Sequence, residues 1–530
     1  MFTQRFLVSL CAVLPGMAFL LSATAVTWAQ PLAIEYAGIV APGTGGKTFY
    51  SSVLPYRPVA NGGSIVFEAQ TTDFNYGLWR WQGGALSKII YAGDPIPGVS
   101  GSSFLSPNEF TANSQGLAAF STFQGLTIET PTGLVSVAKT GDTAPGTSGT
   151  FFGFQDLSYT SNGEISFRGQ VQGGPASFGV WRATTTLVAP VAIDGQSISS
   201  SQSITNTDSF APPAAGNGAT TFAATVGPGN LNAIVRQAGG SAPQVIALQG
   251  QPAPNLPTET YSSFSDPVAN NAGQVAFRAG LSNGDVFNAI FRDLGSGPKF
   301  VIGNGSPMPG PAGAKLDGLS DPVINQAGIL AFTGYLDAFS VPLNTGLEAL
   351  WTIDTFGTIH EIARAGNSVP GVSGAQFGDF IGVPFQMNHT NQIAFLATIN
   401  GASTNNDSGI WATDKNGNLV LVVREGEQVQ VSPGVFRTVR SISFVDSSQS
   451  NGAESAWTDQ SYLAYTLNFT DSTSGIFISA VPEPSSLLLA ALGVASLLGC
   501  STWRRSASSR KKKRCAERNG DSADPSAQRS

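Results

Sequence analysis

Acidic side chains in glycine-rich turns are the residues of this sequence whose type and spacing could do chemistry. They are Asp94, Asp142, Asp194 and Glu427, together with Asp266 and Asp321 in two copies of the phrase "SDPV". If the chain is built from repeats, such carboxylates could form rings at one end of the molecule and bind Ca²⁺. Aspartates also cap turns, and no calcium loop of the EF-hand type is present, so turn capping is the favoured interpretation.

Other catalytic chemistry has little support in the sequence. The two histidines, His360 and His389, belong to no zinc-binding pattern, and His360 lies in a strand-like run that suggests a surface position. No G-x-S-x-G nucleophile motif, phosphate-binding loop or candidate cysteine nucleophile is present. We therefore expect no catalytic, metal-binding or cofactor-binding residue, no cofactor, and a protein that is not an enzyme.

The elements that would position any site are short strands. Glycine (62 residues) and proline (32 residues) are abundant, and only 12% of the 530 residues are charged. The middle of the chain has no long stretch with helical periodicity. It consists of short runs rich in Val, Ile, Phe and Thr, bounded by turn-forming residues, which predicts an all-β fold.

One phrase, Asn-x-x-Gly-x-x-Ala-Phe, repeats along this β region. Its phenylalanine falls at Phe67, Phe120, Phe167, Phe222, Phe277, Phe332 and Phe395, and a degenerate eighth copy surrounds Tyr465. Most copies are about fifty residues apart, and a period in this range indicates a propeller or a solenoid. Because Asn and Gly tolerate positive φ, the Asn-x-x-Gly segment is predicted to be a turn that leads into a strand.

Two further landmarks follow each copy of the phrase. The first is Gly or Ala, an aliphatic residue and usually an aromatic one, which places tryptophans at Trp79, Trp181, Trp351 and Trp411. The second is a strand that ends in a Pro-Gly turn, as at Gly98, Gly146, Gly310 and Gly371. Each unit therefore has about four short strands, as a propeller blade does. The repeated Phe and Trp residues are predicted to form the core between blades.

The two ends of the repeat region are complementary. The region begins with the Pro-Gly landmark, at Gly38, and its last unit, Tyr462 to Ser479, has only the repeated phrase and the aliphatic–aromatic landmark. We therefore predict an eight-bladed β-propeller of four-stranded blades whose closing blade is shared by both termini, since this leaves no open sheet edge. Seven blades or an open β-repeat array are the alternatives.

The N-terminal segment indicates export. Residues 1–29 contain Arg5, an apolar run and small residues before Gln30, as in a secretory signal peptide. The predicted propeller, residues 30–480, has no cysteine. Residues 30–502 carry 17 Lys and Arg against 31 Asp and Glu, so a nucleic-acid partner is not expected.

The C-terminus resembles the PEP-CTERM sorting signal. Val481, Pro482, Glu483 and Pro484 are followed by an apolar stretch, 485–503, and then by Arg504 and Arg505. We expect residues 481–514 to be this signal, with a transmembrane helix, and residues 515–530 to be a disordered tail. The resemblance implies an exosortase-type sorting enzyme as partner, anchoring in the inner membrane before cleavage, and a final place at the cell surface or outside the cell. The chain continues to Ser530, beyond the usual end of this signal, so a permanent single-pass anchor is the alternative.

The repeat region resembles the family of tandem NxxGxxAF-repeat proteins, which carry various C-terminal anchors. That resemblance supplies no activity. The favoured hypothesis is a non-enzymatic surface or matrix protein that associates with an exopolysaccharide. The alternatives are a carbohydrate-active enzyme, which would need a carboxylate pair in a central cleft, and a purely structural spacer.

Overall fold

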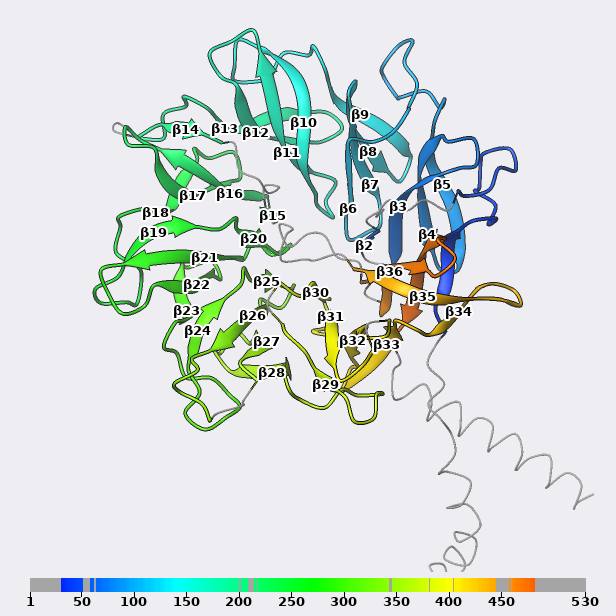
Figure 1. The fold of residues 1–530 in the computed structure, drawn as a ribbon. Coiled ribbons are helices and arrows are strands. Elements are labelled where there is room, and N and C mark those ends of the chain that lie inside the picture. The colour runs from blue at the N-terminus through cyan, green and yellow to red at the C-terminus, as the bar shows by residue number, and fades with distance from the viewer. Residues whose placement is uncertain are drawn as a thin grey trace, which may run out of the picture.

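The computed structural model is a ring of eight antiparallel sheets (Figure 1). It describes residues 30–481, except for 51–57, 62, 200–201, 208–213, 217, 343–345, 381, 404, 445–456 and 459. Each sheet is one blade, and the blades follow one another in chain order around the centre. The predicted all-β, eight-bladed propeller is confirmed.

Blades 1 to 4 are built from the first half of the chain. Blade 1 has β2 (Val59–Asn61), β3 (Ser64–Gln70), β4 (Tyr76–Gln82) and β5 (Ala85–Tyr91). Blade 2 has β6 (Glu109–Ala112), β7 (Ala118–Thr122), β8 (Gly125–Thr130) and β9 (Gly133–Lys139). Blade 3 has β10 (Thr150–Tyr159), β11 (Ile165–Gln172), β12 (Phe178–Ala183) and β13 (Val188–Ile193). Blade 4 has β14 (Ile204–Asn206), β15 (Ala214–Gly216), β16 (Ala219–Val226), β17 (Leu231–Ala238) and β18 (Gln244–Leu248).

Blades 5 to 7 repeat the pattern of blade 4, in which the first strand is divided into two pieces. Blade 5 has β19 (Thr260–Phe264), β20 (Val268–Ala269), β21 (Val275–Ser282), β22 (Asn288–Asp293) and β23 (Lys299–Gly303). Blade 6 has β24 (Leu316–Leu319), β25 (Val323–Ile324), β26 (Leu330–Leu336), β27 (Glu348–Ile353) and β28 (Ile359–Arg364). Blade 7 has β29 (Gln376–Phe377), β30 (Phe385–Met387), β31 (Ile393–Asn400), β32 (Ser408–Thr413) and β33 (Leu419–Arg424).

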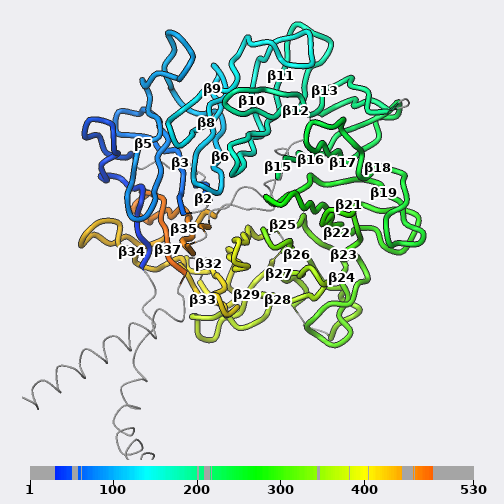
Figure 2. Tube along the Cα trace, turned by 180° about the vertical axis from the view of Figure 1, so that it is seen from behind, coloured from blue at the N-terminus to red at the C-terminus, as the bar shows by residue number. Residues whose placement is uncertain are grey.

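Blade 8 closes the ring with strands from both ends of the chain. It contains β34 (Gln428–Ser432), β35 (Val435–Ser443), β36 (Tyr462–Phe469) and β37 (Ser474–Ala480), and the N-terminal β1 (Leu32–Tyr36) completes it as the outer strand. β1 pairs with β37 from Leu32 opposite Ile478 to Tyr36 opposite Gly475. The predicted sharing of the closing blade is confirmed, and Figure 2 shows β34 and β37 beside the N-terminal strand. The hairpin β34–β35 adds a fifth strand that the sequence pattern does not predict.

The repeated Ala-Phe pair explains why the blades stack. Successive residues of a strand point to opposite faces of the sheet. Phe332 of blade 6 packs with Trp351 against Ala276 and Ile290 of blade 5, and the same arrangement recurs around the ring. Each blade therefore presents aromatic side chains to the preceding blade and small or aliphatic ones to the next.

The predicted core residues are buried between the blades. Phe67 lies opposite Trp79 across the sheet and stacks on it with an interplanar angle of 25°, and Phe395 stacks on Trp411 at 26°. A third ring from the preceding segment meets each pair edge-on, as Phe49 does with Trp79 at 5.0 Å. At most 3% of the surface is exposed for Phe67, Phe120, Phe167, Phe222, Phe277, Phe332, Phe395, Trp79, Trp181, Trp351 and Trp411.

The Pro-Gly turn also has a defined partner in the blade that follows it. The indole Nε1 of Trp79 donates to the carbonyl oxygen of Pro42, that of Trp181 to Pro145 and that of Trp411 to Pro370, at 3.0–3.2 Å. The tryptophan therefore satisfies its only polar atom while the ring remains buried.

Candidate functional site

The ring has two ends of different construction. Because all strands within a blade are antiparallel, the turns between first and second strands and those between third and fourth strands lie at one end, the turn end. The loops between second and third strands and the connections from blade to blade lie at the other end, the loop end. The strands nearest the centre in Figure 1 are β2, β6, β15, β20, β25 and β30, which are first strands or their second pieces.

The Asn-x-x-Gly turns form a hydrogen-bonded belt at the turn end. Asn270 Oδ1 accepts from the backbone N–H groups of Ala272 and Gln274, both at 3.1 Å, while its Nδ2 donates to the Asn325 carbonyl in the next blade at 2.8 Å. Asn325 repeats this arrangement and reaches Asn391 of blade 7. One side chain thus closes its own turn and binds the neighbouring turn.

The glycine of the turn is a second point of attachment. Gly273 and Gly328 adopt left-handed φ values of 75° and 78°, which turn their carbonyl groups toward the preceding blade. Arg236 donates to the Gly273 carbonyl at 3.0 Å and Arg292 to the Gly328 carbonyl at 2.9 Å. Arg80 and Arg182 make the same contact with Gly116 and Gly218. Sequence reasoning missed these arginines, although each directly follows the aliphatic–aromatic landmark.

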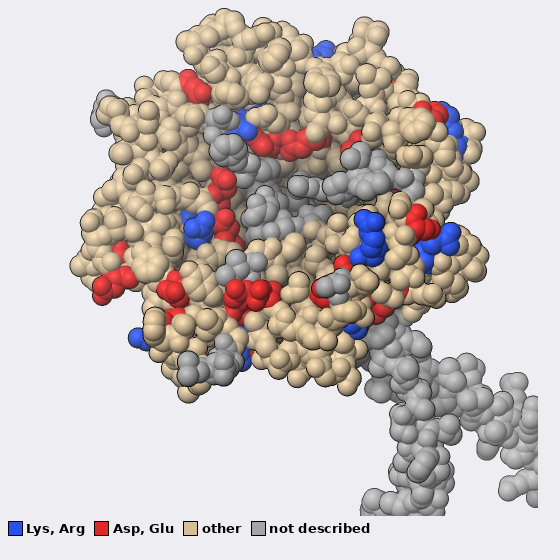
Figure 3. Space-filling view, in the orientation of Figure 1, with Lys and Arg blue, Asp and Glu red and all other residues tan. Residues whose placement is uncertain are grey.

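Carboxylates near the centre also join blades. Glu109 on β6 accepts hydrogen bonds from the backbone N–H groups of Asp156 (2.7 Å) and Leu157 (2.8 Å) in blade 3. Arg278 of blade 5 pairs with Asp321 of blade 6 at 2.7 Å. Burial raises the pKa of Glu109 to about 7, although the hydrogen bond from Leu157 opposes this shift. Figure 3 shows acidic side chains gathered around the central hollow of this face.

Three acidic residues of the glycine-rich turns cap those turns, as the favoured interpretation expects. Asp94 accepts from the backbone N–H of Tyr91 at 2.8 Å, Asp142 from Lys139 at 3.0 Å and Glu427 from Arg424 at 3.3 Å. Asp194 instead accepts from Thr207. Among the described residues, no group of three or more His, Cys, Asp or Glu side chains could hold a metal ion.

The two histidines lie apart from each other. His360 is exposed on β28, the outer strand of blade 6, as expected for a surface position. His389 lies in the Asn-x-x-Gly turn of blade 7, where Asn391 takes the place of glycine with φ 69°.

The loop end carries exposed phenylalanines at equivalent places. Four of them lie in the loops between second and third strands, in blades 1, 2, 5 and 6, and a fifth lies near the start of β10. Their exposed fractions are 63% for Phe74, 80% for Phe123, 53% for Phe287, 99% for Phe339 and 59% for Phe152. Tyr50, 40% exposed, lies 5.2 Å from the Phe74 ring. Sequence reasoning missed this set, because it followed the aromatic residues at the repeated landmarks.

The chain leaves the propeller at the turn end. β37 is a third strand, so its last residue lies where the other blades turn into their fourth strand. Val481, the first residue of the predicted sorting segment, is 2% exposed, and its N–H donates to the Ser461 carbonyl at 2.9 Å. The remaining predicted sorting residues, Pro482, Glu483, Pro484, Arg504 and Arg505, lie outside the described residues, as does the predicted transmembrane helix. Within the described part of the chain, no helix is long and apolar enough to cross a bilayer.

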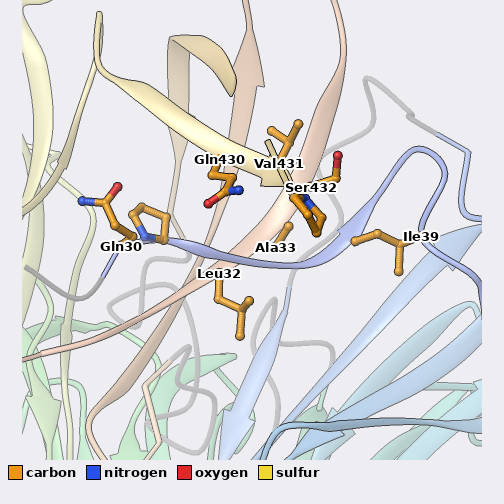
Figure 4. A pocket seen from close by; sticks show the side chains of 9 residues that line it. Gln30, Leu32, Ala33, Ile39, Gln430, Val431 and Ser432 are labelled. Atoms are coloured by element: carbon orange, nitrogen blue, oxygen red, sulfur yellow. The ribbon is translucent and has the colours of Figure 1, made fainter. Parts of the chain in front are cut away.

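The cavities among the described residues include two on the surface of the ring. One, of about 390 Å³, lies between β1 and the hairpin β34–β35, and is lined by Leu32, Ala33, Ile39 and Val431 among others, with no ionisable side chain (Figure 4). The other, of about 750 Å³, lies at the loop end of blade 3, with Ser148, Asp194 and Gln196 in its lining. Neither brings together a pair of carboxylates, so neither resembles a glycosidase centre.

Three solved structures are distantly similar to this chain. A puromycin-hydrolyzing peptidase of Mycobacterium tuberculosis is 12% identical over 83% of this chain, with a TM-score of 0.37, and this chain spans only 61% of it. The WD40 domain of SCAP from fission yeast is 9% identical over 81% of this chain and 95% of its own, with a TM-score of 0.36. An ulvan lyase is 8% identical over 86% of this chain and 95% of its own, with a TM-score of 0.29. At these scores the likenesses carry no functional argument, and no curated protein matches the sequence.

Family models are more informative. A model of the PEP-CTERM protein-sorting motif matches residues 480–506, which confirms that part of the predicted resemblance and implies export through an exosortase-type system. The resemblance to NxxGxxAF-repeat proteins stays a prediction. A model described as a family of unknown function, DUF7453, matches residues 60–488. Because this match covers most of the chain, the protein belongs to the DUF7453 family.

Proposed function

We propose that this protein is a non-enzymatic propeller that binds an exopolysaccharide through its loop end. Sugar rings present flat C–H faces that pack on aromatic rings, and aromatic side chains combine large apolar area with little flexibility. Exposed aromatic residues at matching positions of one surface indicate a binding site more than scattered single ones do. The observation that carries the proposal is therefore the set Phe74, Phe123, Phe152, Phe287 and Phe339 on one end of the ring.

The direction of that end supports the proposal. The PEP-CTERM motif begins at the turn end, so the loop end faces away from the point at which the chain continues toward its sorting segment. A surface protein held at its turn end would present the aromatic loops outward, where polymer is available.

The sorting segment supplies the second part of the proposal. We propose that residues 485–503 hold the chain in the inner membrane until an exosortase-type enzyme cleaves near Pro482-Glu483-Pro484. Mass spectrometry of the protein from its host should then find a C-terminus near Glu483 and no peptide from Arg504 onward. An intact tail on most molecules would favour a permanent single-pass anchor.

The binding proposal is tested with purified protein and the exopolysaccharide of the producing cells. Replacement of Phe74, Phe123 and Phe339 by Ser should weaken binding by about tenfold or more, since each tenfold corresponds to about 1.4 kcal/mol. Phe356→Ser is the matched control, because Phe356 is 95% exposed but lies at the turn end.

Each outcome of this test separates the candidates. Equal affinity of the triple variant and the intact protein would contradict a loop-end site. Release of new reducing ends from the polymer would favour the carbohydrate-active enzyme, and an intact protein that binds no polymer would favour the structural spacer.

A further inference from the structure

Three exposed apolar side chains stand on hairpins at the turn end, outside the proposed polysaccharide site. Leu187 is 64% exposed, Leu294 42% and Phe356 95%. Each lies in the connection between the third and fourth strands of its blade, in blades 3, 5 and 6 respectively. The three hairpins are equivalent by position, so their tips lie on the same face of the ring.

Direct contacts place two of these hairpins beside the belt of Asn-x-x-Gly turns. Arg292 donates both to the carbonyl of Gly328 in the belt, at 2.9 Å, and to that of Asp354 in the Phe356 hairpin, at 3.0 Å. A Cβ on Gly328 would lie 3.3 Å from a methyl group of Leu294. The Asp354 carboxylate accepts from the N–H groups of Phe356 and Thr358, both at 2.8 Å, which fixes the hairpin that carries the exposed ring.

The chain leaves by the same face. In blade 8 the position of this hairpin is occupied by the two termini, since β37 ends and β1 begins there. Val481 is hydrogen-bonded to the turn at Ser461, and the sequence reaches the apolar stretch that begins at Ser485 within four more residues. An extended chain covers at most about 3.6 Å per residue, so this connection keeps the turn end close to the layer that the stretch enters.

We propose that the turn end is a lipid-docking face, on which Leu187, Leu294 and Phe356 insert into the outer surface of the inner membrane while the sorting segment is attached. The proposal rests on the membrane anchoring put forward above. Apolar tips are needed because residues 30–502 are acidic, with 31 Asp and Glu against 17 Lys and Arg, and such a body is not attracted to anionic lipid. Docking would hold the ring with its loop end outward until processing.

The test uses one cysteine at a time in the full chain without its signal peptide, with Cys500→Ser and Cys515→Ser as background. Phe356→Cys is the probe and Phe339→Cys its matched control, since both positions lie in loops of blade 6, are 95% and 99% exposed, and stand at opposite ends. Each cysteine carries an environment-sensitive dye, and the protein is reconstituted with vesicles of phosphatidylethanolamine and phosphatidylglycerol.

We expect the protein to sediment with the vesicles. The dye at position 356 should shift to the blue, be quenched by a lipid-borne quencher and lose most of its quenching by aqueous iodide. The dye at position 339 should keep its iodide quenching. Leu187→Cys, in another blade, should behave as Phe356→Cys does.

The remaining outcomes overturn the proposal in distinguishable ways. Sedimentation with equal iodide quenching at 356 and 339 would contradict docking but leave the anchor intact. Lipid contact at 339 alone would reverse the orientation and contradict the outward loop end. Failure to sediment would contradict the anchor and the docking together, whereas polysaccharide binding is measured separately.

Discussion

The two ends of the propeller differ in what their side chains contact. At the turn end, Asn270 and Arg292 each donate a hydrogen bond to the neighbouring blade. At the loop end, Phe123 and Phe339 stand in solvent. The repeated phrase therefore builds the ring, while the unrepeated loops remain available for binding, as loops on a rigid scaffold usually are. Changes at the two ends should consequently damage different properties.

Loss of the closing strand should have the largest effect. Deletion of residues 31–36 removes β1 and leaves the outer edge of β37 unpaired. We expect a lower unfolding temperature by calorimetry and a tendency to associate through the open edge. A wider deletion, from Pro31 to Pro58, would also remove Phe49, which packs on Trp79 of blade 1, so the shorter deletion is the cleaner test. An unchanged unfolding temperature would contradict closure by β1.

Truncation of one core aromatic should come next. Phe277→Ala removes a fully buried ring that stacks on Phe291, and it should lower the free energy of unfolding by about 3–5 kcal/mol. Phe123→Ala at the loop end should change it by less than about 0.5 kcal/mol. Denaturant unfolding measures both, and equal losses would erase the distinction between core and exposed aromatics.

A single belt asparagine should cost less than a core ring. Asn270→Ala removes three hydrogen bonds within the turn and one to blade 6, so we expect a loss of about 1–3 kcal/mol. Asn283, in a loop-end connection of the same blade, makes an exposed hydrogen bond to Thr260 at 2.9 Å. Asn283 has a left-handed φ of 71°, which glycine adopts without strain, so the control replacement is glycine. Asn283→Gly should be close to neutral in the same unfolding experiment, and a larger loss at Asn283 than at Asn270 would contradict the belt.

The closing blade should also respond to pH. Burial raises the pKa of Glu35 on β1 to about 8, although a hydrogen bond from the backbone of Ile476 opposes the shift. In the unfolded chain this carboxyl has its ordinary, lower pKa. Between that pKa and about 8, folding therefore takes up a proton, and the free energy of unfolding should fall as pH rises from about 5 to 8. Glu35→Gln should flatten that slope in unfolding curves measured at both pH values. An identical slope would show that Glu35 does not titrate in this way.

The fold was predictable from the sequence because each blade repeats a local pattern. Asn-x-x-Gly specifies a turn, the alternation around Phe277 specifies a strand, and the half-units at the termini specify closure. The partners of Arg236 and Arg292 were not predictable, because each reaches a glycine carbonyl in another blade. The exposure of Phe123 and Phe339 was not predictable either. Both lie in loops outside the repeated landmarks, and their exposure depends on the conformation of those loops.

The most direct test measures stability and exopolysaccharide binding on the same two variants. Asn270→Ala should lower the unfolding temperature and leave the affinity of the folded protein unchanged. The triple replacement of Phe74, Phe123 and Phe339 by Ser should leave the unfolding temperature unchanged and lower the affinity by about tenfold or more. A loop-end variant that loses stability while keeping its affinity would contradict the separation of roles between the two ends.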